Sequence, residues 1–272
     1  MSEYPQATQD TLSTEPVHKE LGVEGTGYKI NHIEADSHSR FVVVTLPGFG
    51  GSASAEYRNL TEGNSERPHG LAVSYLHEFD PETLITGLVE EIGKLASNGP
   101  VEIVLHACSY GASILPPLIA KLKDMKNVHI QAILARSPLF DRTCFSDGLQ
   151  TRDARGLTQL FSFGRREQER REKRLAPPDE AKADELLAVL PPTMDQDYVQ
   201  TLRDKGIHHS TILFSDDVVI SNNRVTELLG GHGGKPELLE SNEGYLMGHH
   251  PIDVEGMREY EREWVAGHMS TT

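Results

Sequence analysis

The sequence predicts an α/β protein built on a mostly parallel β-sheet with helices on both faces. Three observations point to this fold. Short runs rich in β-branched residues alternate with amphipathic segments along most of the chain. One run, FVVVTL at 41–46, is apolar at nearly every position, as in a strand buried on both faces. Another, VEIVLHAC at 101–108, leads directly into a serine with small residues two positions away on either side, a spacing typical of a sharp strand–turn–helix.

The predicted elements follow one another in regular order. The segment 80–99 begins with Asp-Pro-Glu, ends with Asn-Gly and repeats its apolar residues every three or four positions, so it is predicted to be a helix. Capping and periodicity of the same kind predict further helices at 112–125, 222–231 and 251–268. The predicted strands cover 28–35, 40–47, 70–76, 101–105, 128–138, 210–215 and part of 236–244.

This alternation is interrupted between about residue 140 and residue 205. The stretch is charged and rich in proline, reads as helical and carries no strand signal. We expect it to cover one end of the sheet as a cap or lid. The expected organisation is therefore a flexible tail (1–21), an α/β core (22–140 and 206–272) and a helical cap (141–205).

Composition and charge argue against several classes of function. The net charge of −15 opposes non-specific binding to nucleic acid or anionic membranes. The basic stretch RREQERREKR at 165–174 pairs acids with bases at helical spacing, as a solvated helix face does. No segment reaches the roughly 18 apolar residues of a membrane span, and the polar N-terminus lacks the apolar core of a secretory signal. Two cysteines, Cys108 and Cys144, fit a reducing compartment, so a cytoplasmic location is expected.

The serine at position 109 stands in a recognisable motif. A nucleophile in a strand–turn–helix is exposed only where the backbone turns sharply, and side chains two positions before and after it must then be small. Around Ser109 these residues are Ala107 and Gly111. ACSYG is thus a G-x-S-x-G elbow with alanine replacing the first glycine. Here the chain resembles the α/β-hydrolase superfamily, over nearly its whole length past the tail.

Two further motifs occur in the order that the resemblance implies. A serine hydroxyl must pass its proton to a base as it attacks, usually a histidine oriented by a carboxylate. In this superfamily the order along the chain is serine, acid, histidine. The strand at 210–215 is followed by Asp216 and Asp217, and the later loop YLMGHHPID carries His249 and His250.

The resemblance favours one residue of each pair. The superfamily pattern after the acid reads D-V-V-I-S from Asp217 and D-D-V-V-I from Asp216, and the register of the following helix favours Asp217. His249 follows a glycine directly and stands in a G-H-x-P context, which favours it over His250. Asp141 is a third candidate for the acid, because some members carry the acid after the preceding strand.

LPGFGGS at 46–52 resembles the oxyanion loop of the superfamily. Acyl transfer creates an oxyanion, and each preorganised donor stabilises it by about 3 kcal/mol. By motif position the donors are the backbone N–H groups of Phe49 and Tyr110. Many members carry His-Gly before the first donor, where this chain has Pro47-Gly48. Another departure is the pair of prolines at 116 and 117, which should leave the helix after the elbow short or bent.

These residues predict a serine hydrolase that cleaves a carboxylic ester or thioester through an acyl-enzyme. Ser109 would attack the carbonyl, His249 would act as base and then acid, and Asp217 would hold the imidazole tautomer. Serine at the elbow excludes the dehalogenases and epoxide hydrolases of this fold, which use aspartate. The alternatives are an acyltransferase on the same scaffold and a non-hydrolytic binding homologue.

The expected chemistry needs no cofactor and no metal, since the adjacent His249 and His250 are poorly spaced to converge on an ion. The expected partner is a small-molecule acyl substrate; the sequence leaves its identity and the oligomeric state open. Apolar patches of the predicted cap, Leu157–Leu160–Phe161 and 186–190, either line an acyl pocket or bury the helices of the cap.

Overall fold

The computed structural model describes most of the chain. Some residues for which the sequence makes a prediction are not among the described ones. The basic stretch 165–174, Phe49, His250, Leu160, Phe161 and residues 1–20 of the expected tail all lie outside the described residues. The described residues are 21–35, 39–48, 53–64, 66–153, 155–159, 180–195, 197–232, 235–240, 249 and 252–269.

One eight-stranded sheet forms the centre of the described part, in the order β1-β2-β4-β3-β5-β6-β7-β8. The two pairings of β2, with β1 and with β4, are antiparallel. All other neighbours are parallel, which confirms the predicted mostly parallel sheet. The strands are β1 (Leu21–Gly25), β2 (Tyr28–Ile33), β3 (Phe41–Leu46), β4 (His69–Tyr75), β5 (Val101–Cys108), β6 (Val128–Arg136), β7 (His208–Phe214) and β8 (Glu237–Leu239).

β1 is a strand that the sequence did not predict, because Leu21 was assigned to the tail. It forms a hairpin with β2 in which Val23 lies opposite Ile30. Two of its five residues are glycine, which is depleted in strands. The intrinsic strand propensity of β1 is therefore weak, and its pairing with β2 stabilises it as a strand.

β3 has the two-sided burial that its apolar run predicts. All six of its residues are buried. Val42, Val44 and Leu46 belong to the larger core cluster on one face of the sheet. Val43 belongs to a second cluster on the other face, together with Tyr57. Such alternation follows from the two-residue period of a strand.

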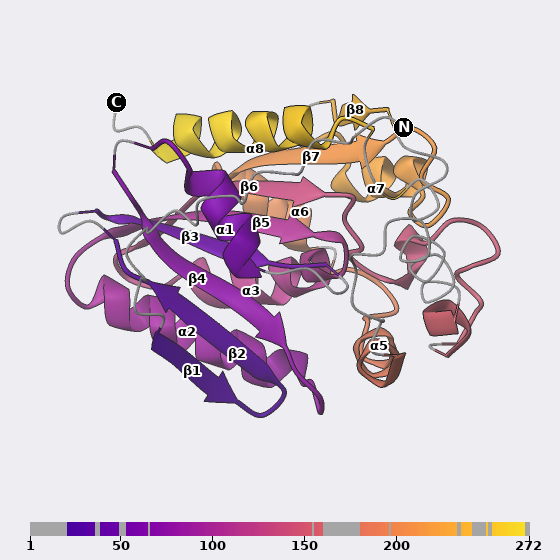
Figure 1. Ribbon diagram of the computed structural model, residues 1–272, viewed down its shortest axis with the longest axis horizontal. Coiled ribbons are helices and arrows are strands. Elements are labelled where there is room, and N and C mark those ends of the chain that lie inside the picture. Colours follow the sequence, from indigo (N-terminus) through magenta and orange to yellow (C-terminus); the bar gives the residue numbers. More distant parts are fainter. Residues whose placement is uncertain are drawn as a thin grey trace, which may run out of the picture.

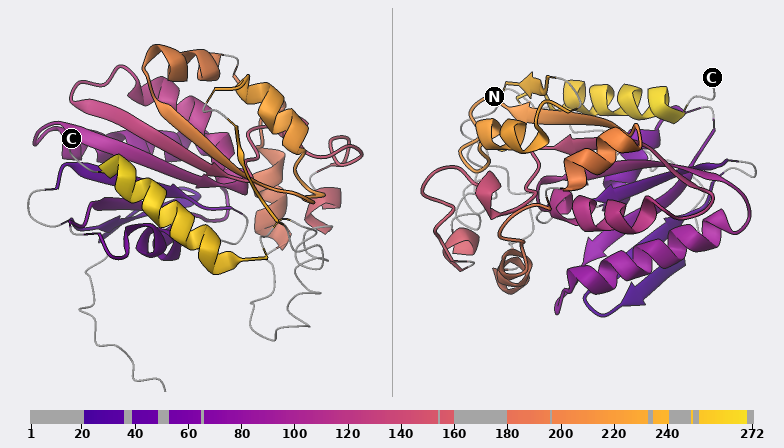
Figure 2. Two further views of the ribbon diagram at one scale, coloured as in Figure 1. Left: turned by 90° about the horizontal axis from the view of Figure 1, so that it is seen from above. Right: turned by 180° about the vertical axis from the view of Figure 1, so that it is seen from behind.

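Helices cover both faces of the sheet. α1 and α8 lie on one face and α2, α3 and α6 on the other, as the opposed views of Figure 1 and Figure 2 show. No helix in the described ranges has the length and apolarity needed to cross a membrane. The helices are α1 (Ala53–Thr61), α2 (Pro81–Ala96), α3 (Leu115–Leu122), α5 (Glu180–Ala188), α6 (Asp197–Asp204), α7 (Asn222–Leu229), α8 (Val254–Met269) and the short 3-10 helices η1 (Ser109–Ile114) and η2 (Arg142–Cys144).

The two prolines after the elbow have a structural explanation. Residues 109–114 form the 3-10 helix η1, and the α-helix α3 begins only at Leu115. Pro116 and Pro117 therefore lie in the first turn of α3, where backbone N–H groups have no partner within the helix and proline is tolerated. The helix predicted over 112–125 is thus shorter and starts later.

Candidate active site

Ser109 lies at the tight turn that the ACSYG motif predicts. β5 ends at Cys108, and Ser109 has a φ of 46°, in the left-handed region that non-glycine residues seldom adopt. A Cβ on Gly111 would overlap the carbonyl oxygen of Leu46, so this position admits only glycine without a shift of β3. Ala107 is fully buried and lies opposite Leu46 in the sheet. The methyl group of Ala107, which replaces the first glycine of the motif, is therefore accommodated in the sheet.

The carboxyl ends of β5, β6 and β7 bring three polar residues to one edge of the sheet. Cys108 pairs with Arg136, so β5 and β6 end side by side, and Arg136 pairs with Ile212, close to the end of β7 at Phe214. Parallel strands direct their carboxyl ends to the same edge, where open α/β sheets bind ligands. Ser109 follows β5, Ser137 follows β6, and the turn after β7 carries Asp217.

A chain of hydrogen-bonding groups joins Ser109, His249 and Asp217. Nε2 of His249 lies 3.1 Å from Oγ of Ser109. Its Nδ1 lies 2.7 Å from Oδ2 of Asp217. The Asp217 side chain is fully buried, whereas that of His249 is 17% exposed. Nδ1 is the donor in the contact with the carboxylate, which leaves Nε2 able to accept the hydroxyl proton of Ser109.

Both oxygens of the Asp217 carboxylate accept hydrogen bonds. Oδ1 accepts the backbone N–H groups of Val219 (2.9 Å) and Ile220 (3.0 Å). Oδ2 accepts His249 Nδ1–H and, at 2.6 Å, the hydroxyl of Ser137. Burial by itself would raise the pKa of Asp217, but the charge of His249 and these hydrogen bonds outweigh it and lower that pKa below its usual value. Asp217 is therefore ionised at neutral pH.

The other acidic candidates do not contact His249. Asp216 is exposed and accepts a hydrogen bond from the hydroxyl of Ser215 (2.9 Å). Asp141 is buried, but its oxygens cap η2 through the N–H of Thr143 (2.7 Å) and bind the N–H of Met194. Asp217 is thus the carboxylate that the structure places beside the histidine.

The predicted oxyanion loop is described only in part. Phe49 lies outside the described residues, but Gly48 does not. A Cβ on Gly48 would stand 3.1 Å from Cβ of Ser109 and 3.3 Å from the carbonyl oxygen of Cys108. The absence of a side chain at position 48 therefore lets the loop after β3 approach the elbow closely. Tyr110, the second predicted donor, directly follows Ser109 and opens η1 with it.

Sequence reasoning missed a buried charge network behind Ser109. Arg136, the last residue of β6, pairs with Glu261 of α8 (2.9 Å) and Glu56 of α1 (2.7 Å). Its Nε and Nη2 each lie 3.3 Å from Sγ of Cys108, the residue before Ser109. His106 Nε2 lies 3.1 Å from Glu261. The sequence signal for this network was Arg136 itself, a basic residue at the end of the apolar run VHIQAILAR.

This network contains the one group of three potential metal ligands that the described part of the chain brings together. The ligand atoms of Glu56, His106 and Glu261 lie within 4.8 Å of one another. Arg136, however, forms ion pairs with both carboxylates. A fixed guanidinium already neutralises these acids and would repel a cation. The group is therefore better described as an ion-pair network than as a metal site.

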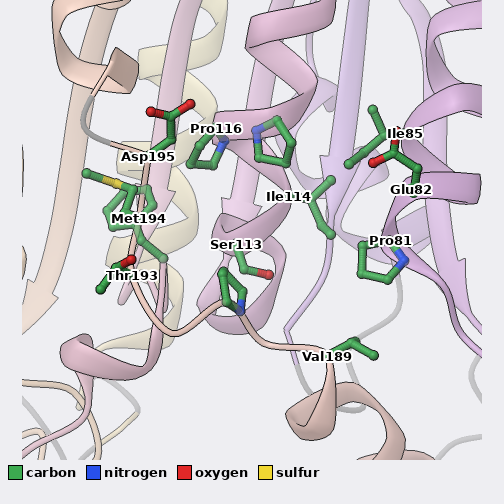
Figure 3. A pocket seen from close by; sticks show the side chains of 13 residues that line it. Pro81, Glu82, Ile85, Ser113, Ile114, Pro116, Val189, Thr193, Met194 and Asp195 are labelled. Atoms are coloured by element: carbon green, nitrogen blue, oxygen red, sulfur yellow. The ribbon is translucent and has the colours of Figure 1, made fainter.

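A cavity of about 270 Å³ lies next to η1, between the N-terminal end of α2 and the segment 189–195. Figure 3 shows Pro81, Glu82 and Ile85 on one side, Thr193–Asp195 on the other, and Ser113 and Ile114 between them. Val189, from the second apolar patch of the predicted cap, also lines it, whereas Leu186, Leu187 and Leu190 are buried in the core. The patch is thus mainly structural.

The sheet order, the helices on both faces and the tight turn after β5 define the α/β-hydrolase fold. The chain is similar to a monoglyceride lipase from Saccharomyces cerevisiae (10% identity, 100% of both chains, TM-score 0.59). It is also similar to a thermophilic esterase from Thermogutta terrifontis (14% identity, 92% of this chain and 100% of the esterase, TM-score 0.55). A peroxisomal alpha-beta-hydrolase from Saccharomyces cerevisiae matches too (10% identity, 95% and 88% of the chains, TM-score 0.60). No family model and no curated protein sequence matches the chain.

Proposed function

We propose that the protein is a serine hydrolase that cleaves carboxylic esters or thioesters. The observation that carries this proposal is the hydrogen-bonded chain Ser109–His249–Asp217 at the carboxyl ends of the central strands. Spacings of 3.1 and 2.7 Å are within the reach that proton transfer requires. Structural neighbours that are lipases and esterases support ester hydrolysis over other chemistry on this fold.

In the proposed first half-reaction, Oγ of Ser109 bonds to the carbonyl carbon while its proton passes to Nε2 of His249. The carbonyl oxygen becomes an oxyanion, stabilised by the backbone N–H groups of Tyr110 and Phe49. As the tetrahedral intermediate collapses, the C–O or C–S bond breaks and Nε2–H protonates the leaving group. The product of this step is an acyl-enzyme and a free alcohol or thiol.

In the second half-reaction, water replaces the leaving group. Nε2 of His249 removes one proton of the water as its oxygen bonds to the acyl carbon. The second tetrahedral intermediate then collapses: the bond between the acyl carbon and Oγ of Ser109 breaks, Nε2–H returns the proton to Oγ, and the carboxylic acid is released. Throughout, ionised Asp217 keeps the hydrogen on Nδ1 and stabilises the imidazolium. No step requires a metal or an organic cofactor, and the substrate is a small acyl compound.

We also propose that residues 141–205 act as a cap over this edge of the sheet. In the described parts of this stretch the named elements are η2, α5 and α6, residues 155–159 are helical as well, and there is no strand. Figure 1 shows α5 on the side toward which the parallel strands point. Ser146 N–H donates to the carbonyl of Val219 (2.9 Å), and Ser221 N–H donates to the carbonyl of Cys144 (2.8 Å). These bonds anchor the stretch to the end of the core near the site.

A panel of p-nitrophenyl esters and acyl thioesters of graded chain length tests the proposal, with Ser109→Ala as the matched variant. We expect a burst of p-nitrophenol followed by steady turnover, and at least about a 1,000-fold loss of kcat in the variant. Equal turnover by both proteins would rule the proposal out. Faster p-nitrophenol release on addition of an alcohol would instead assign acyl transfer to the same site.

A further inference from the structure

We propose that Ser137 is a positioning residue that holds the catalytic acid and base in register, an inference that rests on the proposed function. Its hydroxyl oxygen lies 2.6 Å from Oδ2 of Asp217 and 3.1 Å from Nδ1 of His249. Ser137 is buried, with 1% of its surface exposed. It thus contacts both partners of the proposed Asp–His pair, yet no motif singles it out.

The direction of each hydrogen bond among Ser137, Asp217 and His249 follows from which of their atoms can donate and which can accept. A carboxylate only accepts hydrogen bonds, so the hydroxyl of Ser137 donates to Oδ2 of Asp217. The same oxygen accepts Nδ1–H of His249 at 2.7 Å. The serine oxygen then stands beside Nδ1–H with its lone pairs available. A rotation of the imidazole or of the carboxylate would break a bond to Ser137 as well as the bond between them.

Ser137 also completes the set of donors around Asp217. The backbone N–H groups of Val219 and Ile220 hold Oδ1, and His249 with Ser137 holds Oδ2. An ionised carboxylate offers about four acceptor positions, so all of them are used. Removing the hydroxyl leaves one position empty at a buried charge, where a lost hydrogen bond is costly. The carboxylate then keeps its bonds to Val219, Ile220 and His249 but is held less firmly at Oδ2.

The backbone of Ser137 is held in a conformation that aims this hydroxyl. Its φ of 42° lies in the left-handed region, which glycine adopts without the steric cost that serine incurs. Two hydrogen bonds fix the turn: Ser137 N–H donates to the carbonyl of Ile212 (2.8 Å), and Leu139 N–H donates to that of Ser109 (3.0 Å). Strain of this kind persists only where the surroundings impose it and gathers at functional sites.

Two substitutions separate the hydroxyl from the backbone. Ser137→Ala removes the hydroxyl and keeps Cβ, whereas Ser137→Gly removes it and also relieves the strained φ. For both variants we expect kcat for a p-nitrophenyl ester to fall about 10- to 100-fold, the loss typical of a hydrogen bond to a charged group, with KM within about twofold. Ser137→Gly should melt at or above the temperature of the alanine variant, because glycine adopts this φ freely.

The matched control is Thr211→Val, which removes the buried hydroxyl of β7 that lies 3.5 Å from Nδ1 of His209. It should keep the wild-type kcat. A wild-type kcat in either Ser137 variant, or a loss that appears in KM alone, would overturn the inference. Labelling of the wild type by a fluorophosphonate is measured alongside. If the wild type is not labelled, the proposed function fails; if it is labelled and the Ser137 variants match it, only this inference fails.

Discussion

Arg136 and Glu261 form an ion pair in the interior, with Nη1 of the arginine 2.9 and 3.0 Å from the two carboxylate oxygens. The pair joins the end of β6 to α8, and a second bond reaches Glu56 of α1 at 2.7 Å. α1 comes after the predicted oxyanion loop, and α8 comes after His249. One guanidinium therefore links the elements that flank these segments of the site.

We expect Arg136→Met to lower the free energy of unfolding by about 3–5 kcal/mol, the usual cost of breaking a buried ion pair from one side. Burial would raise the pKa of Glu261, but Arg136 and His106 lower it, so the acid stays charged when folded. Urea unfolding monitored by circular dichroism measures the change. The double variant Arg136→Met/Glu261→Gln should recover part of the loss. A single-variant effect below about 1 kcal/mol would contradict this account of the network.

Asp217→Asn should lower kcat about 10,000-fold with little change in KM, because an amide does not hold the imidazole in the required tautomer. The neighbouring Asp216→Asn provides a matched control, since Asp216 is exposed and accepts a hydrogen bond from Ser215, whereas Asp217 is buried against His249. We expect Asp216→Asn to stay within about threefold of the wild type. The measurement is steady-state hydrolysis of one ester by the wild type, Asp217→Asn and Asp216→Asn. A larger loss in the Asp216 variant would assign the acid to that residue.

His209 should make stability depend on pH. Burial, helped by His232 and His208, lowers the pKa of His209 to about 3, against about 6.5 in an unfolded chain. Between these values the unfolded chain binds a proton that the folded protein does not. The free energy of unfolding therefore falls as pH decreases from about 6.5 to about 3. In His209→Phe, urea unfolding at several pH values should show a shallower fall, and a slope equal to that of the wild type would refute the assignment.

Gly111→Ala should prevent normal formation of the elbow. The added methyl would overlap the main-chain carbonyl of Leu46, and neither β3 nor η1 can shift without disturbing the buried core. We expect a fall in melting temperature of at least about 5 °C, in line with an overpacked core site. Gly63→Ala tests the specificity of this effect, since no atom of the described residues lies within 4 Å of a Cβ there, although its φ of 78° carries a strain of its own. A melting temperature for Gly111→Ala equal to that of the wild type would show that the turn tolerates a side chain.

Local patterns in the sequence were sufficient for most of the fold. β-branched runs such as 41–46 and the capped helix α2 are strong signals because burial and capping act over a few residues. β1 escaped prediction because its order comes from pairing with β2, not from its own composition. The start of α3 was misplaced because the 3-10 geometry of η1 depends on the strained turn at Ser109.

The residues of the candidate site also fall into those that a local motif predicts and those that it does not. Ser109, Asp217 and His249 lie in short motifs, and the structure brings these three side chains together. Ser137 lies in no motif. In the segment after β6, the pattern that the resemblance implies indicates a carboxylate, Asp141, and no hydroxyl. Contacts between residues about 80 to 125 positions apart, such as Ser137–Asp217 and Arg136–Glu261, follow from strand order, which no local pattern encodes.

In the proposed mechanism, Ser109 is activated by His249. Treating the folded protein with a fluorophosphonate and locating the adduct by peptide mass spectrometry tests this activation. We expect one adduct, on Ser109, which forms much more slowly in His249→Ala and is absent in Ser109→Ala. No labelling of the folded wild-type protein, or equally fast labelling of Ser109 when His249 is replaced, would contradict it.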